Sequence, residues 1–215
     1  MKKFGVGCAV LGGLVVIAVL LLIFAGGGYN RLVRLGQAVD QQWAQVQNVY
    51  QRRADLVPNL VATVSGAANF EKSTLTEITA ARASVGQVKL DGTGAPTDPA
   101  KLAEFERAQG ELSSALSRLL VVVERYPDLK ANANFVNLQA QLEGTENRIS
   151  VERNKFNEVV QRYNTRIQQF PGVIFAGMFH FQPRPYFKAA AGSETAPKVE
   201  FNFGNQKAAP VPATK

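Results

Sequence analysis

The chain has 215 residues, with 24 Lys and Arg against 17 Asp and Glu. One Cys excludes a disulfide within the chain, and one His excludes any site that needs two imidazole ligands. Hydrophobic residues make up 46% of the sequence, but their concentration near the N-terminus favours a membrane-attached protein over an ordinary soluble domain.

An apolar segment without a single charge occupies residues 4–25. As a helix it would extend roughly 33 Å at about 1.5 Å per residue, enough to cross a hydrocarbon core of about 30 Å. A cleaved signal peptide is the alternative, but its apolar region is usually about 7–15 residues and ends at small residues. Here Ile23 stands where a small residue belongs, and Cys8 lies too early for a lipoprotein signal. The sequence therefore predicts an uncleaved N-terminal transmembrane helix, with residues 1–28 as the membrane anchor.

The charges around this segment leave its orientation open. Lys2 and Lys3 precede it and Arg31 and Arg34 follow it, so the rule that Lys and Arg gather on the cytoplasmic side selects neither side. Small residues at positions 5, 9 and 13 would share a helix face. They permit two spans to pair as a homo-oligomer, or they are simply small residues scattered along a membrane helix.

Beyond the anchor, apolar residues recur at alternating spacings of three and four. The first series runs from Trp43 to Ala67, and Pro58 is its one helix breaker. Such spacing places the residues on one face of a helix that packs against other helices. Because Pro58 cannot donate a backbone hydrogen bond to Ala54, we expect either a kink there or a restart with Asp55 as the cap.

Three further helices follow the same pattern. The second is expected at about residues 69–88, and the third runs from Asp98, which would be its N-cap, to about residue 123. The fourth and longest is expected at about residues 131–170, before Pro171 and Gly172. The fold prediction is all-α, with an elongated antiparallel helical bundle of about four helices over residues 29–188.

The chain from residue 189 onward is rich in Ala, Gly, Pro, Lys and Thr. This composition buries too little apolar surface to fold, so we expect a disordered tail at residues 189–215. The predicted organisation is therefore an anchor, a helical bundle and a tail.

Several segments resemble the signature sequences of the LemA family. They are residues 51–61 (QRRADLVPNLV), 109–116 (QGELSSAL), 124–132 (ERYPDLKAN), 141–149 (QLEGTENRI), 163–165 (YNT), 170–172 (FPG) and the stretch 181–187. The likeness runs from about Tyr29 to Phe187. The resemblance implies a single N-terminal span and a soluble antiparallel helical bundle in a bacterial membrane protein. It brings no settled biochemical activity and no catalytic residues.

The sequence contains no recognisable catalytic constellation. A di-metal helical bundle would need Glu-x-x-His pairs on two helices, but His180 is the one His and has Gly177 three residues before it. Carboxylates for glycoside chemistry are available, but on long helices they are usually solvated. Basic residues are spread thinly and do not interleave with aromatic residues as in nucleic-acid binding. We expect no enzyme activity, no cofactor, no metal site and no nucleic-acid partner.

One polar group interrupts the apolar pattern of the first helix; it comprises Arg52, Arg53, Asp55 and Asn59. Arg53 occupies a core position, so its side chain should point into a helix interface and needs a partner there. The acidic candidates on other helices are Glu111, Glu146 and Glu152. We expect a polar lock that fixes helix register, with a ligand site as the alternative.

The segment after the fourth helix is too apolar for an exposed loop. An even number of antiparallel helices returns the chain toward the membrane, so Phe170 should end close to Tyr29. We expect the following residues to lie at the headgroup boundary, with aromatic rings inward and polar ends in water. These membrane-interface candidates are Phe175, Phe179, Phe181, Arg184, Tyr186 and Phe187. The alternative is that they cap the core of the bundle.

An anchor, a long helical body and no catalytic constellation favour a non-enzymatic scaffold or adaptor for other membrane or envelope proteins. The alternative is a sensor or regulatory module that binds a small ligand between its helices. The expected location is the bacterial inner membrane as a single-pass protein, with the lipid bilayer as one partner and the side of the bundle left open.

Overall fold

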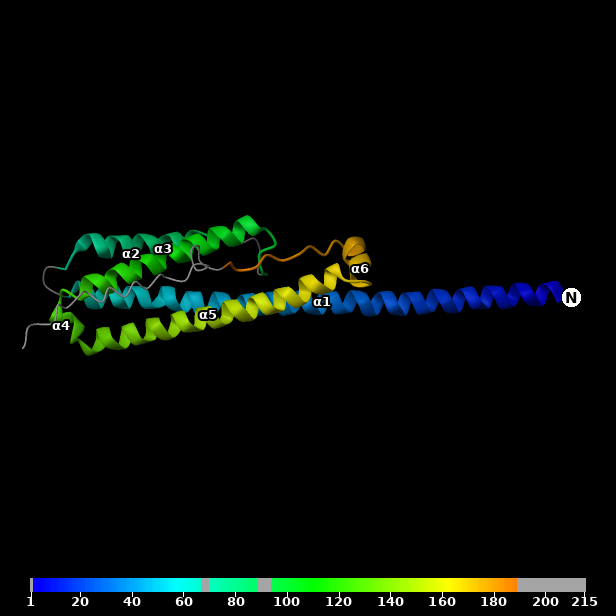
Figure 1. The fold of residues 1–215 in the computed structure, drawn as a ribbon, viewed down its shortest axis with the longest axis horizontal. Coiled ribbons are helices and arrows are strands. Elements are labelled where there is room, and N and C mark those ends of the chain that lie inside the picture. The colour runs from blue at the N-terminus through cyan, green and yellow to red at the C-terminus, as the bar shows by residue number, and fades with distance from the viewer. Residues whose placement is uncertain (1, 67–69, 89–93, 189–215) are drawn as a thin grey trace, which may run out of the picture.

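One helix dominates the computed structural model. α1 runs without interruption from Lys2 to Ser65 and contains 64 residues. At about 1.5 Å per residue this is roughly 96 Å. Its N-terminal part projects alone beyond the other helices (Figure 1). The structure describes residues 2–66, 70–88 and 94–188, without the side chains of residues 2–11, 18 and 21–25, and the tail expected at 189–215 lies outside these ranges.

The transmembrane helix expected at residues 4–25 falls within α1, on residues whose side chains are mostly outside those described. Among the described ones, Leu14, Val16 and Leu20 are exposed. Within the part of the chain that the structure describes, no helix combines the length and the apolar character that a membrane crossing requires.

The restart expected near Pro58 is wrong, because α1 continues through this residue to Ser65. Pro58 has no backbone N–H to offer the carbonyl of Ala54, four residues earlier. A side chain of another helix supplies the missing donor: Arg82 Nε donates to the Ala54 oxygen at 3.1 Å. Asp55 is therefore not a helix cap; its carboxylate accepts from Gln51 Nε2 at 2.7 Å.

The other long helices lie close to their expected positions. α2 spans Lys72–Gln87, α3 spans Pro99–Val123 and α5 spans Ala133–Gln168. α5 packs along α1, and α2 packs along α3 (Figure 1). Two short helices, α4 at Pro127–Lys130 and α6 at Gly172–Phe179, were not expected. The described residues contain helices and no strand, so the all-α prediction is confirmed.

Side-chain caps define where the long helices begin. Asp98 accepts a hydrogen bond from the Ala100 N–H at 2.8 Å, which satisfies one of the free donors at the start of α3. Pro99 follows in the first turn, where its missing N–H costs no hydrogen bond. Asn132 caps α5 in the same way, accepting from Asn134 N at 2.9 Å. The expected Asp98 cap is thus confirmed.

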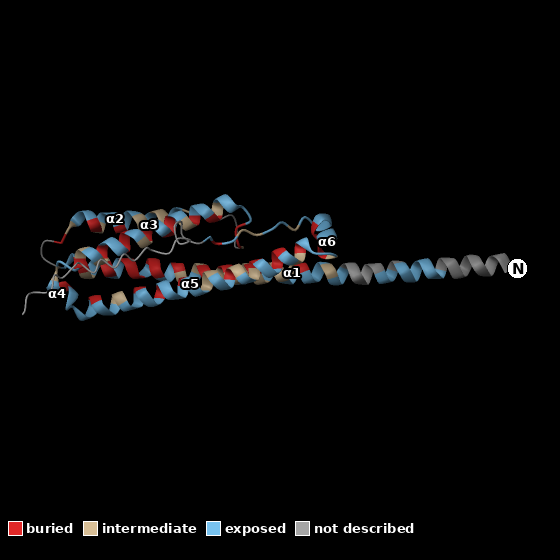
Figure 2. Cartoon of the chain, viewed as in Figure 1, coloured by how far each residue is buried: buried red, intermediate tan, exposed pale blue. Residues whose placement is uncertain are grey.

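Two apolar clusters fill the interior, and both lie on the inward faces shown in red in Figure 2. The proximal cluster, nearer the projecting end of α1, includes Leu32, Val39, Trp43, Tyr50, Phe105, Phe156, Val160, Tyr163 and Phe187. The distal cluster includes Val57, Leu60, Val64, Ile78, Leu112, Leu119 and Phe135. Each such side chain contributes about 1.5–3 kcal/mol on burial.

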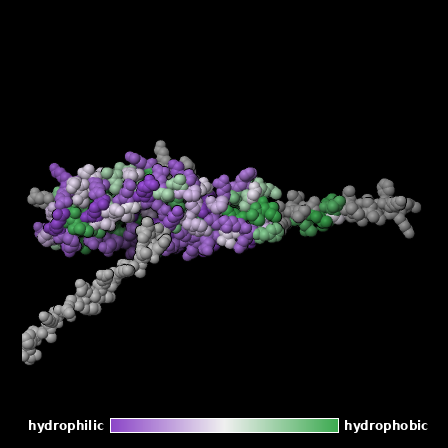
Figure 3. All heavy atoms as spheres, turned by 45° about the horizontal axis from the view of Figure 1, so that its top comes forward, coloured by the Kyte–Doolittle hydropathy of each residue, from purple (hydrophilic) through white to green (hydrophobic). Residues whose placement is uncertain are grey.

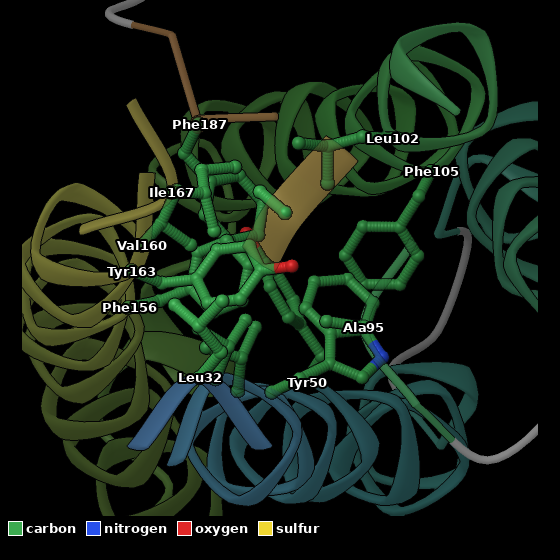
Figure 4. Close-up of a cluster of buried hydrophobic side chains, with 14 of the residues drawn as sticks. Leu32, Tyr50, Ala95, Leu102, Phe105, Phe156, Val160, Tyr163, Ile167 and Phe187 are labelled. Carbon is green, nitrogen blue, oxygen red and sulfur yellow. The ribbon is translucent and has the colours of Figure 1, made fainter. Parts of the chain in front are cut away.

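Aromatic rings from three helices meet at the centre of the proximal cluster (Figure 4). Trp43 of α1 lies 5.3 Å from Phe105 of α3 and 5.5 Å from Phe156 of α5, measured between ring centroids. Phe187 stacks on Trp43 at 5.9 Å. A residue from beyond the last helix therefore completes the core.

Candidate functional site

The guanidinium of Arg53 is the polar centre of the bundle. Arg53 follows Tyr50 by three residues and precedes Val57 by four, so α1 turns it inward with the apolar side chains. It is only 2% exposed. Its Nη1 donates to Ser113 Oγ at 2.6 Å and to a carboxylate oxygen of Glu146 at 3.0 Å.

The second terminal nitrogen of Arg53 bonds to Gln109. Nη2 donates to the Gln109 backbone carbonyl at 3.1 Å and also to the side-chain Oε1. The guanidinium lies 5.1 Å from the centroid of the Tyr50 ring. Burial raises the pKa of the Tyr50 hydroxyl, although Arg153 and Arg53 oppose this shift. One side chain of α1 thus connects α3 and α5.

Arg53 and Glu146 are unequal partners in their ion pair. The Glu146 side chain is 58% exposed and stays in contact with water, so it is mainly Arg53 that loses hydration. Removing a charged group from water costs several kcal/mol, and this free energy is offset only when hydrogen bonds satisfy the charged group. Within the described chain, Arg53 Nε has no hydrogen-bond partner, while both terminal nitrogens are satisfied. Arg53 also lies between the proximal and distal clusters.

The other members of the expected polar group lie on the solvent side of α1. Arg52, Asp55 and Asn59 are all exposed. Asn59 contributes its backbone carbonyl to Thr63 Oγ1 at 2.8 Å, a bond within the same helix. These three residues therefore do not meet Arg53 in the bundle interior. Among the described residues, no three His, Cys, Asp or Glu side chains are grouped to hold a metal ion.

Residues 181–188 form an extended segment that runs back along the bundle (Figure 1). Two asparagines of α5 hold its backbone. Asn164 donates to the Arg184 carbonyl and accepts from the Arg184 N–H, both at 2.8 Å. Asn157 bonds Phe187 in the same way, at 3.0 and 2.9 Å. Each carboxamide thus makes the pair of hydrogen bonds that the backbone of a neighbouring β-strand would make.

Sequence reasoning missed these two asparagines, although a signal was present. Asn157 and Asn164 are seven residues apart, and each directly follows a core aromatic residue of α5, Phe156 or Tyr163. Seven residues are two helical turns, so both carboxamides project from one face. Tyr163 adds a third contact, donating its hydroxyl to the Gln182 carbonyl at 3.0 Å.

Several residues expected at the membrane boundary lie instead inside the bundle. Phe187 is buried against Trp43, which is 14 residues beyond Tyr29 and therefore roughly 21 Å further along α1. Arg184 is largely covered; it pairs with Asp40 at 3.5 Å and donates to the Ala95 carbonyl. These two side chains therefore hold the extended segment against α1.

The aromatic residues of α6 divide between two environments. Phe175 is buried and its ring packs over Gly28 of α1, where a Cβ atom would lie 2.4 Å from the ring. Phe179 is exposed on one side and contacts Tyr29, with 4.8 Å between ring centroids. Phe181 lies 5.9 Å from the same ring. The chain therefore returns to Tyr29 after α5, through Phe179 and Phe181.

The outer surface of α6 and its approach is apolar. Its exposed side chains, named here the apolar collar, are Phe170, Val173, Ile174, Met178 and Phe179. Phe170 is the most open of them, at 78% exposed. Figure 3 shows apolar surface gathered where the projecting part of α1 leaves the bundle. Tyr186, the remaining interface candidate, is exposed on the extended segment.

Gly172 allows α6 to fold back tightly on α5. A Cβ atom at this position would lie 2.0 Å from the backbone oxygen of Arg166, far inside van der Waals contact. At the other end, His180 ends α6 in a left-handed conformation, with φ of 58°. The collar is therefore held against α1 and α5 by backbone geometry as well as by Phe175.

Sequence comparison agrees with this architecture. The model of the LemA family matches residues 42–201. Magnetosome protein MamQ 2 of Paramagnetospirillum magneticum is 24% identical over 185 residues, covering 78% of this chain and 67% of that protein. Protein LemA of Metamycoplasma hominis is 24% identical over 144 residues, covering 67% of this chain and 61% of that protein. None of these names denotes an enzyme.

The fold and its polar centre define an elongated, all-helical protein with one long leading helix. The family match covers most of the sequence and includes the Arg53 network, both asparagines and the extended segment. The chain belongs to the LemA family.

Proposed function

We propose that this protein is a non-enzymatic scaffold or adaptor, anchored in the bacterial inner membrane as a single-pass protein, that holds other membrane or envelope proteins. The observation that carries this proposal is the continuity of α1. One helix leads from the uncharged segment at residues 4–25 into the core of the bundle. A bundle attached in this way has a fixed direction relative to its anchor.

The apolar collar supports the membrane part of the proposal. Large apolar residues on an exposed surface mark interaction sites when they are grouped rather than scattered. The collar lies beside α1 just after the uncharged segment, where Phe179 contacts Tyr29 and the buried Phe175 of the same helix packs on Gly28. A headgroup layer beside α1 would accept its aromatic and aliphatic side chains while water remained around the rest of the bundle.

The flank of the bundle supports the scaffold part. α5 has 36 residues, which is about 54 Å of helix. Three exposed valines lie along the flanks of α3 and α5: Val121, Val136 and Val151. These side chains have no role in the core and are available to a protein partner.

Site-specific photo-crosslinking in native membranes tests the proposal. A photoreactive residue replaces Val121, Val136 or Val151 in the full chain, and the matched control replaces Asn147, an exposed polar residue on α5. We expect discrete adducts with other membrane or envelope proteins at one or more of the valines and none at Asn147. If no position forms an adduct with another protein and a small molecule copurifies with the chain, the result would instead support a ligand sensor.

A further inference from the structure

A basic hollow lies between α1 and α5 at the same end of the bundle as the collar. It has a volume of about 420 Å³ and is lined by Arg31 and Leu35 of α1, by Gln161, Arg162, Thr165 and Arg166 of α5, and by Gln169 just after α5. The described residues that line it include no acidic side chain. Three arginines from two helices therefore line one hollow.

Two of these arginines have no acidic partner within the described chain. Arg162 pairs with Glu158 at 3.3 Å, one turn earlier on α5. Arg31 and Arg166 form none of the ion pairs found among the described residues. Some other arginines of the long helices do form ion pairs, as Arg118 does with Glu77 and Arg153 with Glu106. The hollow thus carries unneutralised positive charge.

The position of the hollow matches the depth of a lipid headgroup. Arg31 lies six residues beyond Ala25, the end of the uncharged segment, and this is about 9 Å along the helix at about 1.5 Å per residue. A headgroup layer is about 5–8 Å thick on each side of the hydrocarbon core. If the uncharged segment fills the core, the Arg31 backbone lies at the outer edge of the headgroup layer, and its long side chain, which leans toward the N-terminus of α1, extends back to the level of the phosphates.

The apolar surroundings continue from the hollow into the collar. Gln169 lines the hollow, and the next residue in the chain is Phe170, the most exposed member of the collar. Leu35 contributes an apolar wall on the α1 side. In a molecule with a phosphate and an acyl chain, the phosphate would contact the arginines and the acyl chain would contact the collar.

We propose that this hollow binds the phosphate-bearing headgroup of an anionic phospholipid, with Arg31 and Arg166 as the binding residues. The proposal rests on the membrane anchoring proposed above. Guanidinium groups bind phosphate oxygens through paired hydrogen bonds, and two of them from different helices orient one phosphate. Such a lipid would also fix the rotation of the bundle about α1 relative to the membrane.

Lipid binding to the full chain in detergent, measured by native mass spectrometry, tests this proposal. The probes are phosphatidylglycerol, phosphatidylcholine and inorganic phosphate. The test variant is Arg31→Gln with Arg166→Gln. The matched control is Arg52→Gln with Arg148→Gln, which removes the same charge from two exposed positions further along the bundle. Circular dichroism verifies that both variants remain helical.

We expect the wild-type chain to bind phosphatidylglycerol about tenfold or more tightly than phosphatidylcholine, because each arginine should raise the affinity for the anionic lipid by a factor of about five. The test variant should lose this preference and the control should keep it. An equal loss in both variants, or no loss in either, would overturn the proposal. Inorganic phosphate that displaces phosphatidylglycerol at similar concentrations would overturn it in favour of a soluble phosphate ligand.

Cosedimentation with lipid vesicles separates this proposal from the one on which it rests. Both variants keep the uncharged segment of α1 and should cosediment as the wild-type chain does. A wild-type chain that stays in solution would contradict the membrane anchor itself. A chain that cosediments but shows no preference for phosphatidylglycerol would contradict the headgroup site alone.

Discussion

Arg53 is the residue through which the two apolar clusters of the bundle are joined. It bonds Ser113 and Gln109 on α3 and Glu146 on α5, so sliding any of these helices by one turn would break its bonds. Apolar contacts are far less directional and tolerate such a slide better. We infer that Arg53 fixes the register of α1 against α3 and α5.

Replacing Arg53 should therefore cost more than replacing its acidic partner. We expect Arg53→Ala to lower the free energy of unfolding by about 3 kcal/mol, because it leaves the buried oxygens of Gln109 and the half-buried hydroxyl of Ser113 without their donor. Glu146→Gln should cost about 1 kcal/mol or less, since the exposed carboxylate is well solvated. Chemical denaturation of the full chain in detergent measures both. If Arg53→Ala lowers the free energy of unfolding by less than about 0.5 kcal/mol, Arg53 does not fix the register of the helices.

Glu106 gives the bundle a specific response to pH. Burial raises the pKa of its carboxyl above the ordinary value, and this outweighs the opposing effect of Arg153, with which it pairs at 2.9 Å. The folded chain thus binds this proton more tightly than the unfolded chain. The contribution of Glu106 to stability is full below the ordinary pKa of a carboxyl and is lost as the pH rises through the raised value.

The matched variant Glu106→Gln removes this titration while keeping the shape of the side chain. We expect the wild-type chain to gain thermal stability relative to Glu106→Gln as the pH falls from about 7 to about 4. Paired melting curves followed by circular dichroism measure the difference. A wild-type chain that loses stability relative to the variant on acidification would mean that the ion pair, rather than burial, dominates.

The heptad spacing of α1 was enough to place Arg53 in the interior. The same spacing puts Arg52 one residue off the core face, and Asp55 and Asn59 lie on the solvent side. The sequence offered three acidic partners for Arg53. Choosing Glu146 among them required the axial register of α1 against α5, and the apolar periodicity of each helix does not specify this register. The Gln109 contact was missed for the same reason, since it depends on how α3 lies against α1.

The continuity of α1 depends on a contact between helices. Its core face is unbroken from Leu32 to Val64, so a break at Pro58 would have divided the distal cluster between Val57 and Leu60. Arg82 of α2 supplies the hydrogen bond that Pro58 cannot. The sequence alone showed that Pro58 cannot donate to the Ala54 carbonyl. It did not identify Arg82 as the donor, because Arg82 is 28 residues from Ala54 along the chain.

A double-mutant cycle tests this compensation. Arg82→Met keeps most of the side-chain stem and removes the donor, and should cost about 1 kcal/mol of unfolding free energy. In a Pro58→Ala background the new backbone N–H can bond Ala54, so Arg82→Met should cost at least about 0.5 kcal/mol less. Denaturant unfolding of the four chains gives the coupling. Additive effects within about 0.3 kcal/mol would show that Arg82 and the missing N–H are independent.

The long helices followed from apolar periodicity and capping residues, but the final segment did not. Residues 181–187 contain aromatic rings beside Arg184, which suggested a segment at the headgroup boundary, with capping of the bundle core as the alternative. In the structure their backbone bonds to Asn157 and Asn164, and Phe187 enters the core. A segment without regular periodicity gains its position from side chains of another helix, and such partners are not visible in its own sequence.

At the level of the whole molecule, the helices bring the start of the bundle at Tyr29 and the C-terminal end of α5 to one place. α1 enters the bundle at Tyr29, and α6 packs against it there after α5 has returned. The collar and the basic hollow therefore share the end nearest the uncharged segment. The opposite end holds the α4 turn and the N-terminus of α5 (Figure 1). This polarity is the basis for assigning one end to the membrane.

Spin-label accessibility in the full chain, reconstituted in a lipid bilayer, measures that assignment directly. With Cys8 replaced by Ser, single nitroxide labels are placed at Ile174 and Met178 of the collar and at Val136 near the opposite end. These positions are similarly exposed in the structure, at 51%, 62% and 50%. We predict that labels at 174 and 178 collide more with oxygen than with a water-soluble nickel chelate, and that the label at 136 shows the reverse. Equal access of the nickel chelate to all three labels would contradict a membrane-facing collar.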